Sequence, residues 1–126
     1  ISGLIRFLRS PLAERMTRAH SSKKLFREQP FVMGIPADEA GEGLPHNEMI
    51  TVQGIIDAFF IENAGIVLLD YKTDYVEAGR EDMLIGRYQA QLLWYKRALE
   101  QMTGKKVKET LIYSFGVSKT LVVDKI

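Results

Sequence analysis

The sequence predicts a mixed α/β (α+β) domain in which helices flank a central mixed sheet of about five strands. The apolar run of residues 66–69 has no polar alternation, which indicates a central strand covered on both faces. Residues 81–102 carry apolar side chains three and four positions apart, which indicates a long amphipathic helix. A length of 126 residues with 46% hydrophobic content suits one globular domain with a real core.

Two short helices are expected first. Residues 2–9 place apolar side chains on one helical face, and Ser10-Pro11 then resembles the N-cap and first position of a second helix over residues 12–20. A strand is expected at residues 25–33. Residues 36–47 contain two prolines, two glycines and three acids, so we expect a loop there.

Two strands follow, at residues 49–61 and 66–73, and residues 62–65 between them are typical of a tight hairpin connection. Residues 74–79 are expected to form a loop that leads into the long helix.

The helix over residues 81–102 should end at Gly104, the residue type that most often follows a helix C-terminus. Two more strands are expected at residues 108–115 and 120–123. The apolar stripe of the helix consists of Leu84, Tyr88, Leu92, Tyr95, Leu99 and Met102.

The composition excludes several classes of protein. The chain has no cysteine, which excludes disulfides, zinc–thiolate sites and iron–sulfur clusters and fits a reducing compartment. No apolar stretch approaches the roughly 20 residues of a transmembrane helix, and no signal peptide is visible. Because the sequence begins with Ile1, we expect a processed chain or a piece of a longer one.

The net charge of +1 conceals an asymmetry along the chain. Residues 1–29 are basic, residues 30–63 hold six acids and no lysine or arginine, and residues 64–126 are weakly basic. A basic end beside an acidic centre suggests a polyanionic partner and a cation site. A solvated helix face followed by an acidic loop explains the same charges.

Three charged residues carry the most chemical information. For a hairpin loop of either two or four residues, the numbers of paired positions add to 127, which places Asp57 opposite Asp70 on one face. Lys72 lies two residues further along and points to that face. Two facing carboxylates repel each other, so one must take a proton or both must bind a cation.

Two interpretations of this group remain open. The group is either a buried salt-bridged cluster or a Mg²⁺ site for phosphodiester hydrolysis, in which Lys72 orients water or neutralises developing charge. A hairpin register shifted by one residue would turn Asp57 to the opposite face and favour the first interpretation.

The ordered motifs resemble a known family. Gly54-x-x-Asp57, then the run Asp-Tyr-Lys-Thr-Asp at 70–74, then Gln91-x-x-x-Tyr95 resemble the RecB-type nucleases of the PD-(D/E)xK superfamily. The similarity is closer still to the C-terminal nuclease domains of AddA-type subunits of AddAB helicase–nucleases. It covers residues 25–100, including the Arg-Glu-Gln-Pro-Phe segment at 27–31.

The resemblance implies a restriction-endonuclease-like core and a role for each matching residue. Asp57 and Asp70 would ligate Mg²⁺ or Mn²⁺ together with the backbone carbonyl of Tyr71, and Lys72 would be the catalytic lysine. Residues expected to support the site or contact DNA are Gln91, Tyr95, Glu28, Gln53 and Thr73.

The family's metal-binding histidine has no counterpart here, since neither His20 nor His46 lies in a matching motif. We therefore expect the family's N-terminal helix to be missing and residues 1–126 to be a single truncated nuclease domain. Residues 1–24 would be a basic helical lead-in and residues 25–126 the nuclease core. Such a fragment would bind metal weakly and cut slowly or not at all.

The resemblance implies an exonuclease domain of an ATP-dependent helicase–nuclease that processes double-strand breaks for recombinational repair in the bacterial cytoplasm. Its partners would be single-stranded DNA, the helicase portion of the parent chain and an AddB-type subunit, with no membrane. No P-loop is present, so helicase activity must lie elsewhere. The alternative is a catalytically silent module of the same fold that binds DNA or docks a partner.

Overall fold

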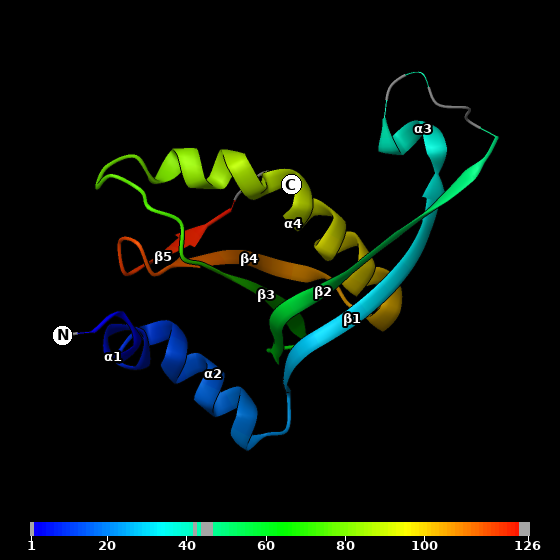
Figure 1. Cartoon of the computed structure of the whole chain (residues 1–126). Helices are drawn as coiled ribbons and strands as arrows, with labels where there is room; N and C mark the ends of the chain where they lie inside the picture. The colour runs from blue at the N-terminus through cyan, green and yellow to red at the C-terminus, as the bar shows by residue number, and fades with distance from the viewer. Residues whose placement is uncertain (1, 42, 44–46, 124–126) are drawn as a thin grey trace.

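A computed structural model describes residues 2–41, 43 and 47–123 of the chain. Helices and strands follow the predicted order, with one additional short helix, α3 (Figure 1). The elements are α1 (Gly3–Leu8), α2 (Pro11–Ser21), β1 (Leu25–Pro36), α3 (Ala37–Ala40), β2 (Met49–Glu62), β3 (Gly65–Lys72), α4 (Glu81–Thr103), β4 (Val107–Ser114) and β5 (Lys119–Val122).

The five strands form one mixed sheet in the order β1-β2-β3-β4-β5, which confirms the predicted fold class. Strands β3 and β4 are parallel, and every other neighbouring pair is antiparallel. The α4 helix supplies the long crossover that a parallel β3–β4 pair requires. Strand β3 lies at the centre of the sheet, and Ile66 to Leu69 are fully buried as predicted.

Each of the two N-terminal helices begins directly after a serine N-cap. The side chain of Ser2 accepts a hydrogen bond from the Ile5 amide, and that of Ser10 accepts one from the Ala13 amide. Both helices lie under one face of the sheet (Figure 1). Their buried side chains, including Phe7, join a cluster with that face of β3 and β4.

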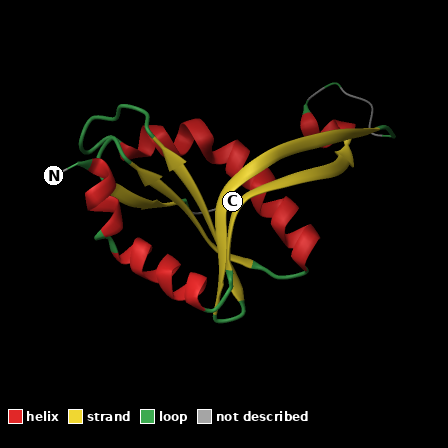
Figure 2. Cartoon of the chain, turned by 60° about the horizontal axis from the view of Figure 1, so that its bottom comes forward, coloured by secondary structure: helices red, strands yellow, loops and turns green. Residues whose placement is uncertain are grey.

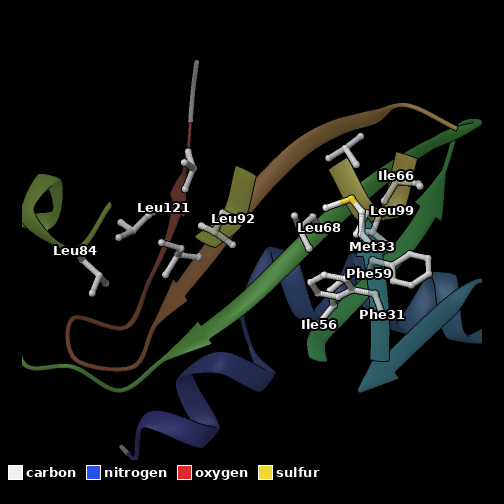
Figure 3. Close-up of a cluster of buried hydrophobic side chains, with 14 of the residues drawn as sticks. Phe31, Met33, Ile56, Phe59, Ile66, Leu68, Leu84, Leu92, Leu99 and Leu121 are labelled. Atoms are coloured by element: carbon white, nitrogen blue, oxygen red, sulfur yellow. The ribbon is translucent and has the colours of Figure 1, made fainter. Parts of the chain in front are cut away.

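Helix α4 covers the opposite face and forms the main core (Figure 3). Leu84, Leu92 and Leu99 from its predicted stripe are fully buried. Met102 belongs to the predicted stripe, but it is 47% exposed because it lies in the last turn of the helix. Gly104 ends the helix with a left-handed φ of 72°, as predicted.

The β2–β3 hairpin has the predicted register. Glu62 pairs with Gly65 and Ala58 with Leu69, so the loop consists of Asn63 and Ala64 alone. Both loop residues have positive φ, 51° and 67°, which is the conformation of a type I′ turn. The register shifted by one residue is therefore wrong.

The predicted loop over residues 36–47 is partly wrong, because Ala37–Ala40 form the helix α3. Asp38 and Glu39 occupy its first turn, where a negative charge interacts favourably with the helix dipole. His46 lies outside the described residues.

Strands β1 and β2 continue beyond the rest of the sheet as a two-stranded ribbon that carries α3 (Figures 1 and 2). Along the β1–β2 pair, the residues that point to the main core change from even to odd numbers in β1. Near its start, β1 places the partly exposed Phe26 on Phe59 of the main core, whereas further along Phe31 and Met33, which have the opposite parity, enter that core. Glu28, with a left-handed φ of 49°, lies between these two parts of β1.

Within the described ranges, no helix has both the length and the apolar character needed to span a bilayer.

Candidate active site

The site lies where β2 separates from β3. Counted from the hairpin turn, the last paired residues of these strands are Ala58 and Leu69. Asp57 and Asp70 are the next residue on each strand. Beyond that pair, the Asp57 carboxylate accepts a hydrogen bond from the Tyr71 amide at 2.9 Å. A side chain thus satisfies a strand amide where the neighbouring backbone turns away, and this contact fixes Asp57 beside the end of β3.

Asp70 is buried near the carboxyl end of β3, with 3% of its surface exposed. Burial, together with a hydrogen bond to the Asp57 carboxyl, raises the pKa of Asp70 to about 6, while the nearby Lys72 acts in the opposite direction. Protonation of Asp70 therefore relieves the predicted repulsion below about pH 6, and above it the ionised Asp70 is paired with the Lys72 ammonium.

Lys72 provides the positive charge of the site. Its Nζ lies 2.9 Å from Asp70 Oδ2, and its side chain is only 17% exposed. Burial lowers the pKa of Lys72, but the hydrogen bond and the charge of Asp70 outweigh it, and the net pKa is raised. The side chain is accordingly an ammonium at neutral pH, which donates hydrogen bonds and cannot accept a proton.

Helix α4 holds Lys72 from the other side. The Lys72 ammonium lies 3.9 Å from the centre of the Tyr88 ring and 3.4 Å from Gln91 Oε1. Gln91 Nε2 in turn donates a hydrogen bond to the Tyr95 hydroxyl at 3.0 Å. Tyr88, Gln91 and Tyr95 follow one another at steps of three and four positions, so they share one face of the helix as predicted.

Gly54 is required by the packing behind Tyr95. The Phe31 and Tyr95 rings meet edge to face at 5.5 Å. A Cβ on Gly54 would lie 3.1 Å from Phe31 and 3.5 Å from Tyr95, closer to Phe31 than side chains normally approach. The glycine of the Gly54-x-x-Asp57 motif thus leaves room for the aromatic pair.

Sequence reasoning missed two residues of this group. Asp74 Oδ2 accepts hydrogen bonds from Arg87 at 2.6 Å and from the Tyr88 hydroxyl at 2.8 Å. Asp74 directly follows the Asp-Tyr-Lys-Thr segment, and Arg87 lies four residues before Gln91. The four-residue spacing of Arg87 and Gln91, which places both on one face of α4, could have identified Arg87 as a neighbour of the site.

Several predicted supporting residues lie away from this group. Gln53 and Thr73 are exposed, and Gln53 pairs with Val32 on the ribbon. Glu28 is aligned with Asp57 by the β1–β2 register, but it is exposed. The Tyr71 ring points to the opposite face of the sheet, where it meets Phe7.

His20, which sequence reasoning treats as a poor match to the family's metal ligand, is exposed on α2 and lines a hollow behind Tyr71. Among the described residues, no group of three or more histidine, cysteine or acidic side chains is arranged to hold a metal ion. Asp57 and Asp70 are nevertheless adequate for Mg²⁺, which commonly takes one or two carboxylates and completes its shell with water and substrate oxygens. The buried Asp70 Oδ2 is ion-paired with the Lys72 ammonium at 2.9 Å but accepts no hydrogen bond of good geometry, so it retains lone pairs for a cation.

Comparison with known proteins gives a consistent result. No model of a protein family matches the chain. The chain is 48% identical over 120 residues to the AddA subunit of the ATP-dependent helicase/nuclease of Acetivibrio thermocellus, a match covering 92% of the chain and 9% of that relative. The corresponding protein from Thermoanaerobacter sp. is 49% identical over 112 residues, covering 86% of the chain and 9% of that relative.

A third relative of that name, from Clostridium perfringens, is 43% identical over 125 residues, covering 95% of the chain and 10% of the relative. The chain therefore spans about a tenth of the length of these proteins. It belongs, as a segment of that size, to the AddA family of ATP-dependent helicase/nuclease subunits.

Proposed function

We propose that this chain carries the nuclease site of an ATP-dependent helicase/nuclease and hydrolyses phosphodiester bonds of DNA. The observation that carries the proposal is the convergence of Asp57, Asp70 and Lys72 at the carboxyl end of β3. Two adjacent carboxyl groups, one of them buried, beside an ordered ammonium can hold a divalent cation and stabilise negative charge on a phosphodiester.

Asp57 and Asp70 would hold Mg²⁺ or Mn²⁺, and the Tyr71 carbonyl between Asp70 and Lys72 is the additional ligand that the family resemblance implies. When bound, the ion would polarise the phosphate and lower the pKa of a coordinated water. Asp57 is already oriented by the Tyr71 amide, so it loses little conformational freedom on binding a cation.

Lys72 would neutralise charge that develops on the phosphate oxygens. Its ammonium is held between Asp70, Gln91 and the Tyr88 ring, so little reorganisation is needed during the reaction. Because the pKa of Lys72 is raised, a role as general base is disfavoured at neutral pH.

The substrate we propose is single-stranded DNA delivered by the helicase motor of the longer protein, with exonucleolytic cleavage during the processing of double-strand breaks. An AddB-type subunit would be the partner. The names of the relatives, which join a helicase and a nuclease activity in one protein, support this assignment. A bacterial cytoplasmic location follows from the same proposal.

The test is a cleavage assay on the full-length protein in which this segment carries Asp70→Asn or Lys72→Ala. Both variants should abolish cleavage of labelled single-stranded DNA in Mg²⁺ and leave ATP-driven unwinding intact. Arg18→Ala, at an exposed site on α2, is the matched control and should cut like the wild type. Wild-type cleavage by Asp70→Asn would identify the domain as a catalytically silent module.

A further inference from the structure

One large aromatic side chain stands in solvent beside the candidate active site. Tyr75 follows β3 by three residues and is 81% exposed, the most exposed of the large hydrophobic side chains in the described part of the chain. A single exposed aromatic ring is common on protein surfaces, so the side chains that surround Tyr75, and not its exposure alone, indicate whether it binds a ligand.

Tyr75 stands between two hollows in the surface. The first has a volume of about 290 Å³ and is lined also by Arg80, Met83 and Arg87. Arg80 and Arg87 retain 57% and 49% exposure of their side chains, although each pairs with an aspartate. Met83 is 52% exposed and adds an apolar surface beside the tyrosine.

The second hollow is wider and more open, with a volume of about 540 Å³. Arg6 from α1 and Lys119 from β5 line it together with Tyr75. Glu77 lines both hollows, and Lys119 pairs with Glu81 as Arg80 and Arg87 pair with aspartates, so among the four cations only Arg6 has no ion pair within the described residues. The walls beside Tyr75 therefore present guanidinium and ammonium groups that are partly exposed, each within reach of an anionic ligand although most already pair with a carboxylate.

Asp74 connects this surface to the catalytic group. It precedes Tyr75 in the chain and binds both Arg87, on the wall of the first hollow, and the Tyr88 hydroxyl. The Tyr88 ring in turn contacts the Lys72 ammonium. A chain of direct contacts thus runs from the first hollow to Lys72.

An exposed aromatic ring flanked by guanidinium and ammonium groups is the combination that binds single-stranded nucleic acid. Unpaired bases stack on the ring, and the cations follow the phosphates. Double-stranded DNA offers no free base face for such stacking.

We propose that Tyr75 is a stacking platform for a base of single-stranded DNA next to the scissile phosphate, with Arg80 and Arg87 on one side and Arg6 and Lys119 on the other. The proposal rests on the nuclease function above and names the part of the surface that selects a single strand. Tyr75 is a substrate-binding residue and takes no part in the bond-breaking step.

The test measures binding without cleavage. Fluorescence anisotropy of a labelled thymidine oligomer is recorded with the purified chain in EDTA, and a duplex of the same length serves as the comparison ligand. Tyr75→Ala should weaken single-strand binding about tenfold, whereas Tyr75→Trp should bind at least as well as the wild type. Circular dichroism should show the same thermal midpoint for all variants, because the ring is exposed.

Two charge variants test the cationic walls independently. Arg80→Ala should weaken binding severalfold and reduce the dependence of log Kd on log salt concentration by about one unit. Glu77→Gln should strengthen binding, which a purely structural role of this loop would not produce. Arg18→Ala, with 68% exposure on α2, is the matched control and should bind within about twofold of the wild type.

Unchanged single-strand binding by Tyr75→Ala would overturn the proposal, as would an equal loss for duplex and single strand. A wild-type chain that does not bind the oligomer would also overturn it and would point to a protein partner for this surface. These outcomes are separate from failure of the nuclease function, which only the cleavage assay with Asp70→Asn detects.

Discussion

The ammonium group of Lys72 lies over the ring of Tyr88, 3.9 Å from its centre. The same tyrosine donates a hydrogen bond from its hydroxyl to Asp74. Tyr88 therefore joins the candidate catalytic lysine to the loop that follows β3, and its ring and its hydroxyl have separable roles.

Tyr88→Leu should reduce DNA cleavage about threefold to tenfold, because the cation–π contact that orients Lys72 is lost. Tyr88→Phe keeps the ring and loses only the hydrogen bond to Asp74, so its effect should be smaller. The measurement is the rate of single-strand cleavage by the full-length protein. Equal rates for Tyr88→Leu and the wild type would show that the ring does not position Lys72.

The pKa of Asp70, raised from 3.8 to about 6, makes the stability of the metal-free chain depend on pH. The folded state holds this proton more tightly than the unfolded state, so the stabilisation is complete below about pH 4 and is lost as pH rises through 6. Asp70→Asn does not titrate. Its free energy of unfolding relative to the wild type should therefore increase by about 2 kcal/mol between about pH 4 and 7.5, as urea denaturation at each pH would show.

Mg²⁺ should compete with the same proton. Above about pH 6 the Asp70 carboxylate is ionised and available to a cation, whereas below that pH a proton occupies it. Added Mg²⁺ should raise the melting temperature at about pH 7.5 and have little effect at about pH 5, as differential scanning calorimetry would detect. A shift of equal size at both pH values, or one retained by Asp70→Asn, would place the ion elsewhere.

Ala64→Gly should stabilise the fold by about 0.5–1 kcal/mol, since Ala64 adopts a φ of 67° in the β2–β3 turn and a Cβ is unfavourable there. Ala90→Gly, at an exposed position of α4, is the matched control and should destabilise by about 1 kcal/mol. Thermal denaturation measures both changes. Destabilisation by Ala64→Gly would contradict the turn geometry.

Gly116→Ala should destabilise the fold by about 2 kcal/mol and reduce cleavage, because its Cβ would collide with the Asp74 carbonyl oxygen and displace the loop beside Lys72. Gly86→Ala provides the control, since a Cβ there meets no atom within 4 Å and alanine favours a helix. Gly86→Ala should stabilise by about 0.5–1 kcal/mol. Equal thermal midpoints for the wild type and Gly116→Ala would show that the loop moves aside freely.

Most of the fold could be predicted because its signals are local. The buried run at residues 66–69, the serine caps of α1 and α2, and Gly104 after α4 each determine structure within a few residues. Helix α3 escapes prediction because four residues give little periodicity. Met102 belongs to the predicted apolar stripe, but it lies in the last turn of α4, where its side chain is 47% exposed.

The candidate site was predictable only in part. The hairpin register brought Asp57 next to Asp70 by simple counting, since both strands share one short turn. Counting residues could not predict that β2 and β3 are paired only from Ala58 onward. It also could not predict that the Asp57 carboxylate accepts a hydrogen bond from the Tyr71 amide. Both features depend on the path of strands β1 and β2, which is irregular at Glu28, where φ is 49°.

The sequence by itself determined the elements, the hairpin register and the identity of the charged residues, because these follow from turn length, periodicity and side-chain chemistry. The tertiary structure decided which of those residues act together. The crossover through α4 places Tyr88 and Gln91 over Lys72, and the loop after β3 leaves Tyr75 in solvent between two hollows that arginine and lysine side chains line. Such contacts join residues far apart in the chain, and only the packing of the helix against the sheet fixes their distances.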